Sequence, residues 1–259
     1  MSKKQNNIIT TMLLIVGITL LFYPYIKMTI LTQKTSRIKY VYDKSIAEES
    51  KQLFDLSKLQ APNMKQILEM NSSTNFSSVL SLLPLDKRLP VSNDTSSTSF
   101  LTGGVNMYPT RDPMRDNLVI LGHHLSDRDL LFGDISKLKQ RDELILTTPT
   151  HEYMYEITEV YITDEKNVSV LSPTTKPKMT LITCDQPNYT KKRLIVDADL
   201  IHYKETSDRQ MKRIDYFQNN ELVDKPTILN SNKGSKSLWL MSLYIILTWL
   251  IIKLFLINS

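Results

Sequence analysis

Cysteine is nearly absent from this sequence, because Cys184 is the only one among 259 residues. One thiol cannot form an internal disulfide, so the chain is not a small secreted scaffold stapled by disulfide bonds. A lone cysteine is most often a buried structural residue, although a cysteine held partly as thiolate is a strong nucleophile. The surroundings of Cys184 therefore decide between a structural and a chemical role.

The sequence also lacks a concentrated basic surface, and no internal repeat is apparent. Lysine and arginine outnumber aspartate and glutamate by 32 to 27, which gives a formal net charge of +5. These basic residues are scattered among acidic ones and form no patch interleaved with aromatic residues, so nucleic acid is not expected as a partner. We interpret the excess as ordinary surface charge, with attraction to anionic lipid or cell-wall polymer as the alternative.

Long apolar runs, in contrast, are present near both ends of the chain. Residues 8–26 form a nearly unbroken apolar run without a charge, preceded by Lys3 and Lys4. This run is long enough for a helix to cross the hydrocarbon core of a bilayer. Residues 23–27 offer no small-residue cleavage site, so an uncleaved membrane anchor is favoured over a signal peptide.

A second apolar run of spanning length covers residues 238–257, with Trp239 near one end and Lys253 placed to reach the interface at the other. Two spans on either side of one domain put both termini on one side of the membrane and the domain on the other. Positive charge does not settle the orientation, because basic residues precede and follow the first span: Lys3, Lys4, Lys27, Lys34, Arg37 and Lys39.

The chain divides into five predicted segments. These are an N-terminal tip and transmembrane helix (1–28), a helical stalk with N-terminal helices (29–78), a β-domain (79–203), a polar tether (204–237) and a C-terminal transmembrane helix (238–259). Within the stalk, residues 64–70 are expected to form a short helix and residues 71–78 a polar break.

The β-domain is predicted from short apolar runs separated by turns rich in Pro, Asn, Asp and Ser. One short helix or turn is expected at 128–139, where Leu131, Ile135 and Leu138 fall near helical spacing. Many short strands with few long helices indicate an all-β domain, closed or sandwiched. The predicted strands are residues 79–83, 118–121, 143–147, 153–162, 179–183 and 194–201.

The context of Cys184 favours a reactive role. The cysteine ends a predicted strand and precedes a polar stretch, so its side chain is expected at the edge of a strand. To react at neutral pH, the thiol needs a nearby cation or a general base. His123 also follows an apolar strand, and Gly122 before it lets the chain turn and project the imidazole into a groove.

The other histidines are weaker candidates for this base. His124 would point away from His123 in an extended chain. His151 and His202 lie in or next to polar turns and are expected on the surface.

Arg193 is the candidate donor for the oxyanion that an acyl-transfer reaction would form. It begins the strand that follows the cysteine loop, so a β-hairpin would bring it beside Cys184. The alternative is a basic surface residue at a strand start, because Lys191 and Lys192 precede it.

Together these residues resemble the sortases, the transpeptidases of Gram-positive bacteria. The pentapeptide Thr-Leu-Ile-Thr-Cys ends at Cys184, with His123 located 184 − 123 = 61 residues upstream and Arg193 located 193 − 184 = 9 residues downstream. Residues 54–59, 81–91 and 100–104 are similar to the housekeeping, class A type. The resemblance covers roughly residues 53–203.

The resemblance implies an eight-stranded closed β-barrel with short helices, flanked here by two transmembrane helices and located on the extracellular face. Cys184 would attack the Thr carbonyl of a Leu-Pro-x-Thr-Gly (LPXTG) sorting signal, and an amine of a cell-wall precursor would resolve the thioester. His123 would be the general acid and base, and Arg193 would hold the oxyanion or the substrate backbone. The implied partners are LPXTG-bearing surface proteins, the cell-wall precursor and membrane lipid.

Three alternatives stay open from the residues. A C-terminal anchor is more familiar in pilin-polymerising sortases, which join subunits through a lysine amine, although the only Asp-Pro, at 112–113, lacks the aromatic residue of their lid and fits a turn. A non-catalytic sortase-like scaffold would bind sorting signals without cleaving them. A sortase substrate is disfavoured, because no LPXTG precedes the C-terminal apolar run.

No cofactor is expected. Asp127, Asp129 and Asp134 could bind Ca²⁺, as acidic loops of some relatives do, but their spacing does not match the calcium-loop pattern, so solvated acids are expected. The sequence leaves open whether Asp185, the acid beside the thiol, tunes its reactivity or caps the loop.

Overall fold

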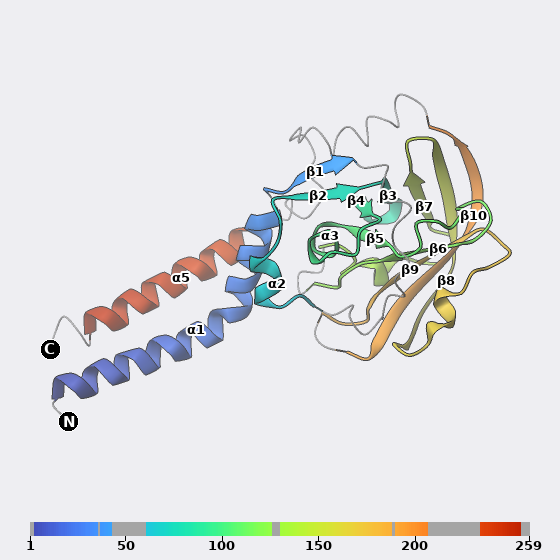
Figure 1. Cartoon of the computed structure of the whole chain (residues 1–259). Coiled ribbons are helices and arrows are strands. Elements are labelled where there is room, and N and C mark those ends of the chain that lie inside the picture. The colour runs from blue at the N-terminus through green and yellow to red at the C-terminus, as the bar shows by residue number, and fades with distance from the viewer. Residues whose placement is uncertain are drawn as a thin grey trace. The chain divides into compact units, whose positions relative to one another are not determined.

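The computed structural model describes residues 3–35, 37–42, 61–125, 130–187, 190–206 and 234–254. The chain forms two compact units, one made of residues 1–34 with 231–259 and the other of residues 35–230. The first unit contains two long helices, and the second contains all the described strands (Figure 1). The division into five segments stays a prediction, because residues 43–60 of the stalk and 207–233 of the tether lie outside the described residues.

The first unit consists of α1 (Lys3–Thr35) and α5 (Gly234–Ile252). Among the described residues, α1 is the one helix long and apolar enough to cross a membrane, and very little of it is buried within the protein. The apolar part described in α5 is shorter, Ser242–Ile252. The structure therefore agrees with the first predicted span, while the second span and the two-pass topology stay predictions.

The two helices of this unit contact each other. The hydroxyl oxygens of Thr19 and Tyr244 are 3.1 Å apart, within hydrogen-bonding distance. The ring centroids of Phe22 and Tyr244 are 5.6 Å apart. One tyrosine of α5 thus makes both a polar and an aromatic contact with α1.

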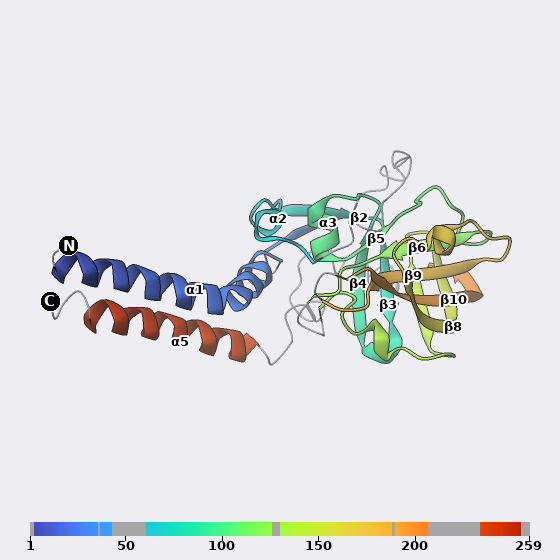
Figure 2. The ribbon, with the colours of Figure 1, turned by 90° about the horizontal axis from the view of Figure 1, so that it is seen from below.

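Eight strands of the second unit form a closed β-barrel in the order β10–β8–β7–β3–β4–β5–β6–β9, with β9 paired to β10 (Figures 1 and 2). The pairs β4–β5 and β6–β9 are parallel and the others are antiparallel. This confirms the predicted eight-stranded closed barrel. The strands are β3 (Ser78–Leu82), β4 (Lys87–Ser92), β5 (Gly104–Asn106), β6 (Asn117–Leu121), β7 (Glu143–Thr147), β8 (His151–Asp164), β9 (Lys178–Cys184) and β10 (Lys192–Glu205).

The parallel pair of β6 and β9 is the part of the barrel that positions the site. Every residue of β6 is buried, and so are the last six residues of β9. Because both faces of these strands are covered, their sequences Asn-Leu-Val-Ile-Leu and Met-Thr-Leu-Ile-Thr-Cys do not show a simple alternation of apolar and polar residues. Their burial fixes the two strand ends firmly in the barrel wall.

Two short strands lie outside the barrel, in a region where no strand was predicted. β1 (Lys39–Tyr42) pairs in parallel with β2 (Ser73–Phe76). Part of the expected helical stalk is therefore extended, and the expected polar break contains a strand. Phe76 packs edge-on against the rings of Tyr40 and Tyr42. The serine-rich sequence gives no sign of a strand, because the burial of β2 comes from this contact with a segment distant in sequence.

The short helices agree with the expectations only in part. α2 (Met64–Leu68) forms where a short helix was predicted, and Asn63 and Gln66 cap its first turn reciprocally. α3 (Ser97–Thr102) lies in a stretch that was expected to be a turn. Within 128–139, where 126–129 are not described, the helical part is the 3₁₀ turn η4 (Ile135–Lys137).

Candidate active site

The ends of β6 and β9 lie side by side, which brings His123 and Cys184 to neighbouring strand ends. Just beyond β6, the backbone N–H of Gly122 donates to the carbonyl oxygen of Ile182 at 3.0 Å. The Thr183 hydroxyl donates to the Gly122 carbonyl at 2.7 Å. These two bonds fix the turn that leads into His123, and they come from the last residues before the cysteine.

Gly122 is required here by close packing. A Cβ atom at this position would lie 2.6 Å from the ring of the fully buried Phe132. The backbone N–H of Phe132 donates to the His123 carbonyl, and the imidazole of His123 lies 5.6 Å from the ring of Phe100, measured between centroids. His123 is therefore a buried imidazole with an aromatic wall on one side.

Arg193 lies directly opposite Cys184, because the two residues are register partners in the antiparallel pair of β10 and β9. Cross-strand partners project from the same face of a sheet. The Arg193 side chain is completely buried and donates to the carbonyl oxygens of Thr190 and Lys192, both at 2.9 Å, and to Glu165 at 2.9 Å. The predicted hairpin is thus present, but Arg193 is a buried residue and not a surface one.

On the face of β6, β9 and β10 that carries Cys184 and Arg193, the residues paired across the strands form successive rows leading away from these two residues. The row next to Cys184 and Arg193 is apolar and belongs to a buried cluster with Phe100 and the 3₁₀ turn η5 (Val168–Leu171). The following row is mixed, with one apolar residue of the same cluster and two polar residues. The register partners are Leu121, Ile182 and Ile195 in the apolar row and Val119, Thr180 and Asp197 in the next.

The pKa of the Cys184 thiol is raised above its ordinary value. Burial is the largest cause, the positive charge of Arg193 acts in the opposite direction, and the negative charges of Asp185 and Glu165 add to the increase. A cysteine with a raised pKa is protonated at neutral pH. In this structure the site therefore holds a neutral thiol close to a buried cation.

Asp185 influences the thiol through its charge. Its backbone N–H donates to the Lys192 carbonyl at 3.3 Å, which extends the β9–β10 pairing by one bond. Its carboxylate also raises the pKa of the Cys184 thiol. The bond to Lys192 comes from the backbone, whereas the carboxylate disfavours the thiolate.

His124 contacts the backbone of the cysteine strand. Its Nδ1 lies 2.8 Å from the carbonyl oxygen of Cys184, and since a carbonyl only accepts, Nδ1 carries the proton. His124 lies beyond the end of β6 and forms an isolated antiparallel bridge with Leu131. A second adjacent histidine was the only sequence signal for this contact.

The remaining two histidines lie far along the β8–β10 pair from Cys184. His202 is exposed, as predicted, whereas His151 is half-buried with its ring near Tyr153 and Tyr203. Neither is brought to the site.

Asp134 is buried and paired with Lys87, so the expectation of a solvated acid was wrong for this residue. Lys87 Nζ also donates to the Leu131 carbonyl at 3.0 Å. Asp127 and Asp129 lie outside the described residues, and among those that are described no group of His, Cys, Asp or Glu could hold a metal ion.

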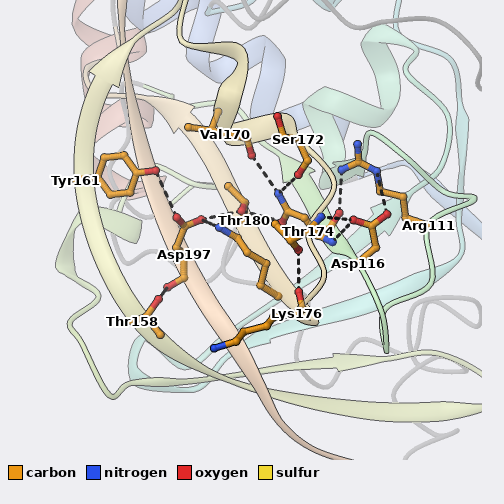
Figure 3. A network of polar contacts seen from close by, with 12 residues as sticks. Arg111, Asp116, Thr158, Tyr161, Val170, Ser172, Thr174, Lys176, Thr180 and Asp197 are labelled. Carbon is orange, nitrogen blue, oxygen red and sulfur yellow. Dashed lines mark hydrogen bonds and ion pairs between the residues drawn. The ribbon is translucent and has the colours of Figure 1, made fainter.

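The connection between β8 and β9 contains η5, and a polar network ties this connection to the first residues of β6 and β9 (Figure 3). The Asn117 amide donates to the carbonyls of Val170 and Ser172, and the Thr174 N–H donates to Asp116. On the other side, the Thr180 hydroxyl lies 2.9 Å from Asn117 Oδ1 and 2.7 Å from Asp197 Oδ1. This network was not predicted, since its partners are up to 63 residues apart in sequence.

Comparisons with known proteins agree with these features. Residues 83–201 match the family model described as "Sortase domain". Sortase A of Listeria monocytogenes is 31% identical over 205 residues, covering 74% of this chain and 90% of that protein. Sortase A of Bacillus anthracis is 26% identical over 202 residues, covering 76% of this chain and 95% of that protein.

The solved structure of Listeria monocytogenes sortase A covers 55% of this chain and 97% of that one, with a TM-score of 0.51 and 31% sequence identity. The resemblance inferred from the motifs around Cys184 is thereby confirmed. This chain belongs to the sortase family.

Proposed function

We propose that this sortase is a membrane-anchored cysteine transpeptidase that cleaves LPXTG-type sorting signals between Thr and Gly and transfers the protein to an amine of the cell-wall precursor. The observation that carries the proposal is the cross-strand pairing of Cys184 with Arg193 at the strand end beside His123. A thiol, a guanidinium and an imidazole at one edge supply the nucleophile, the oxyanion donor and the proton carrier of acyl transfer.

In the first half of the proposed reaction, Cys184 Sγ gives its proton to His123 and attacks the Thr carbonyl carbon. Arg193 donates hydrogen bonds to the oxyanion that forms. The C–N bond breaks as His123 returns the proton to the leaving Gly nitrogen, and a thioester to Cys184 remains.

In the second half, an amine attacks the thioester carbon and loses a proton to His123. The C–S bond breaks, a new amide bond forms, and the thiolate takes the proton back from the imidazolium. The raised pKa of the Cys184 thiol agrees with a resting pair that is mostly neutral, from which a small thiolate–imidazolium fraction reacts.

The proposal places the enzyme at the membrane through α1, with the barrel on the extracellular side and both termini inside. The length and apolar character of α1 support the anchor. The extracellular side is where LPXTG-bearing proteins and cell-wall precursors would meet the barrel. The two-pass arrangement would also bring the chain into contact with membrane lipid at both ends.

The test uses the full chain in detergent with a panel of sorting-signal peptides and candidate amines, and reads the products by mass. We expect cleavage of LPXTG peptides and transfer to a cross-bridge amine, with Cys184→Ala folded but inactive. Cleavage by Cys184→Ala would contradict the assignment. Transfer to a pilin lysine would favour the pilin-polymerising alternative, and peptide binding without turnover would favour the non-catalytic scaffold.

A further inference from the structure

Arg193 is a completely buried cation that forms an ion pair with Glu165. The distance between Arg193 Nη2 and Glu165 Oε2 is 2.9 Å. The guanidinium also donates to two neutral backbone carbonyls, those of Thr190 and Lys192. Since removing one partner of a buried ion pair leaves an uncompensated charge, Glu165 has a strong influence on where Arg193 can lie.

The backbone of Glu165 is fixed against the strand that carries Arg193. Glu165 follows β8 directly, and its N–H donates to the Lys191 carbonyl at 2.7 Å, the residue before β10 begins. The carboxylate is mostly buried, with 12% of the side chain exposed. Glu165 therefore approaches the guanidinium from a fixed direction, at the base of the connection that leads to η5.

Glu165 also acts on the charge balance at the thiol. Arg193 favours the thiolate of Cys184, while Glu165 and Asp185 oppose it. Two histidines also lie near the cysteine: His124, which donates to its carbonyl, and His123 at the neighbouring strand end. Because Glu165 pairs directly with Arg193, it cancels part of the field that the guanidinium exerts on the sulfur.

We propose that Glu165 is the positioning residue of Arg193: its carboxylate holds the guanidinium opposite Cys184 and keeps the cation neutralised while the site is at rest. This inference rests on the proposed function for the reaction that Arg193 serves. When the substrate oxyanion forms, it becomes a second negative partner of the guanidinium, whose position Glu165 has already fixed. The donor is thus oriented before the substrate binds, which avoids a cost of reorganisation during the reaction.

The experiment measures alkylation of Cys184 by iodoacetamide against pH in the full chain in detergent. Since the chain has one cysteine, the reaction reports on this thiol alone. Glu165→Gln keeps a hydrogen-bond acceptor and removes the charge, so the midpoint of alkylation should move to lower pH. A midpoint lower by about half a unit corresponds to an alkylation rate about threefold higher at neutral pH, if the thiolate is the reacting form. Glu159→Gln, an exposed substitution on β8, is the matched control and should leave the midpoint in place.

Turnover provides the second readout. Glu165→Ala removes the acceptor as well as the charge, so kcat should fall by about tenfold or more with KM nearly unchanged, because an oxyanion donor is misplaced. Glu165→Asp should retain the alkylation midpoint of the parent chain, with a kcat between those of the parent and Glu165→Ala. If Glu165→Gln does not fold, Glu165→Asp alone decides, and a kcat equal to that of the parent would overturn the proposal.

An alkylation midpoint in Glu165→Gln that equals the control, or lies above it, would also overturn the inference. Failure of the proposed function has a different signature, namely that the parent chain cleaves no sorting-signal peptide. Since alkylation needs no peptide, the two failures are distinguishable.

Discussion

At the residue scale, the chemistry of the site depends on one thiol in a mixed environment. Burial and two carboxylates, those of Asp185 and Glu165, raise the pKa of Cys184, and Arg193 partly offsets them. Two negative charges therefore oppose the thiolate, and one positive charge favours it. Because the resting thiol is mostly protonated, the protein without substrate should react slowly with alkylating reagents. A bound substrate that displaces water from the site would change this balance of charges.

The first prediction concerns the pH dependence of that thiol. Because the folded-state pKa is raised, the protonated form is favoured up to a higher pH than in a free cysteine, whose pKa is about 8.5. At a pH where the alkylation rate of the chain unfolded in urea has reached its plateau, the alkylation rate of the native chain should still increase with pH. Iodoacetamide kinetics at a series of pH values measure both. Equal midpoints in the native and unfolded chains would contradict the burial argument.

The second prediction separates the two adjacent histidines. His123→Ala removes the proposed proton carrier, and kcat should fall by at least about 100-fold, the usual contribution of general acid–base catalysis. His124→Ala removes one hydrogen bond to the Cys184 carbonyl, for which about 1 kcal/mol and a rate loss of several-fold are expected. Peptide cleavage by the two variants is the measurement, with circular dichroism as the folding control. Comparable losses would indicate that the roles are assigned wrongly.

At the element scale, two segments are fixed by buried polar contacts. The segment after His123 is fixed by Lys87, which pairs with Asp134 and donates to Leu131, a residue with a positive φ of 47°. The connection that carries η5 is fixed by Asn117. Both contacts join segments that are distant in sequence, so each couples a loop to the barrel wall.

The third prediction tests the Lys87–Asp134 pair. Lys87→Met leaves a buried carboxylate without its cation, which should lower the free energy of unfolding by about 3–5 kcal/mol. The double variant Lys87→Met/Asp134→Leu removes both charges and should recover most of that loss. Urea unfolding of the three proteins measures the effect. A double variant as unstable as Lys87→Met would mean that the stability depends on the ion pair itself and not on avoiding an uncompensated buried charge.

The fourth prediction tests the polar network of Figure 3. Asn117→Ala leaves the carbonyls of Val170 and Ser172 without this donor, which should loosen η5 beside the apolar row of the site. KM for a sorting-signal peptide should rise by up to about tenfold, the equivalent of ~1.4 kcal/mol, while alkylation of Cys184 stays the same. Thr158→Ala, an exposed change in the same network, is the control. An unchanged KM would show that η5 does not depend on Asn117.

At the scale of the whole molecule, the chain combines a sortase barrel with two helices that form a separate unit. The contact of Tyr244 with Thr19 and Phe22 gives α5 a defined partner in α1. An interhelical hydrogen bond of this kind is a typical contact between helices that share a membrane. It supports the expectation that α5 accompanies α1 in the bilayer.

The fifth prediction tests this topology. Alkaline phosphatase folds and is active only after export, so a fusion after residue 206 should be active and a fusion to the C-terminus inactive if both ends of the chain lie inside. Activity measured in whole cells, normalised to the amount of fusion protein, checks this. An active fusion at the C-terminus would show that α5 does not cross the membrane in the proposed direction.

The features that could be predicted are those with a local signal. The run at 143–147 coincides with β7, and the predicted strand at 179–183 lies within β9, because β-type side chains and turn residues bound these segments. β1 and β2 were missed, since their burial comes from aromatic contacts across a gap in sequence. The contact of His124 with the Cys184 carbonyl was missed for a similar reason, since the two residues are 60 positions apart in sequence.

The sequence by itself determined the family, the barrel class and the identity of the three candidate residues, because the motifs around Cys184, His123 and Arg193 lie in short segments with fixed spacing. Only the tertiary structure decided which charges surround the thiol. The pairing of Arg193 with Glu165 and the bond from His124 to the Cys184 carbonyl join residues 28 and 60 positions apart. Such contacts are set by strand register and burial, which closing the barrel fixes and local sequence does not.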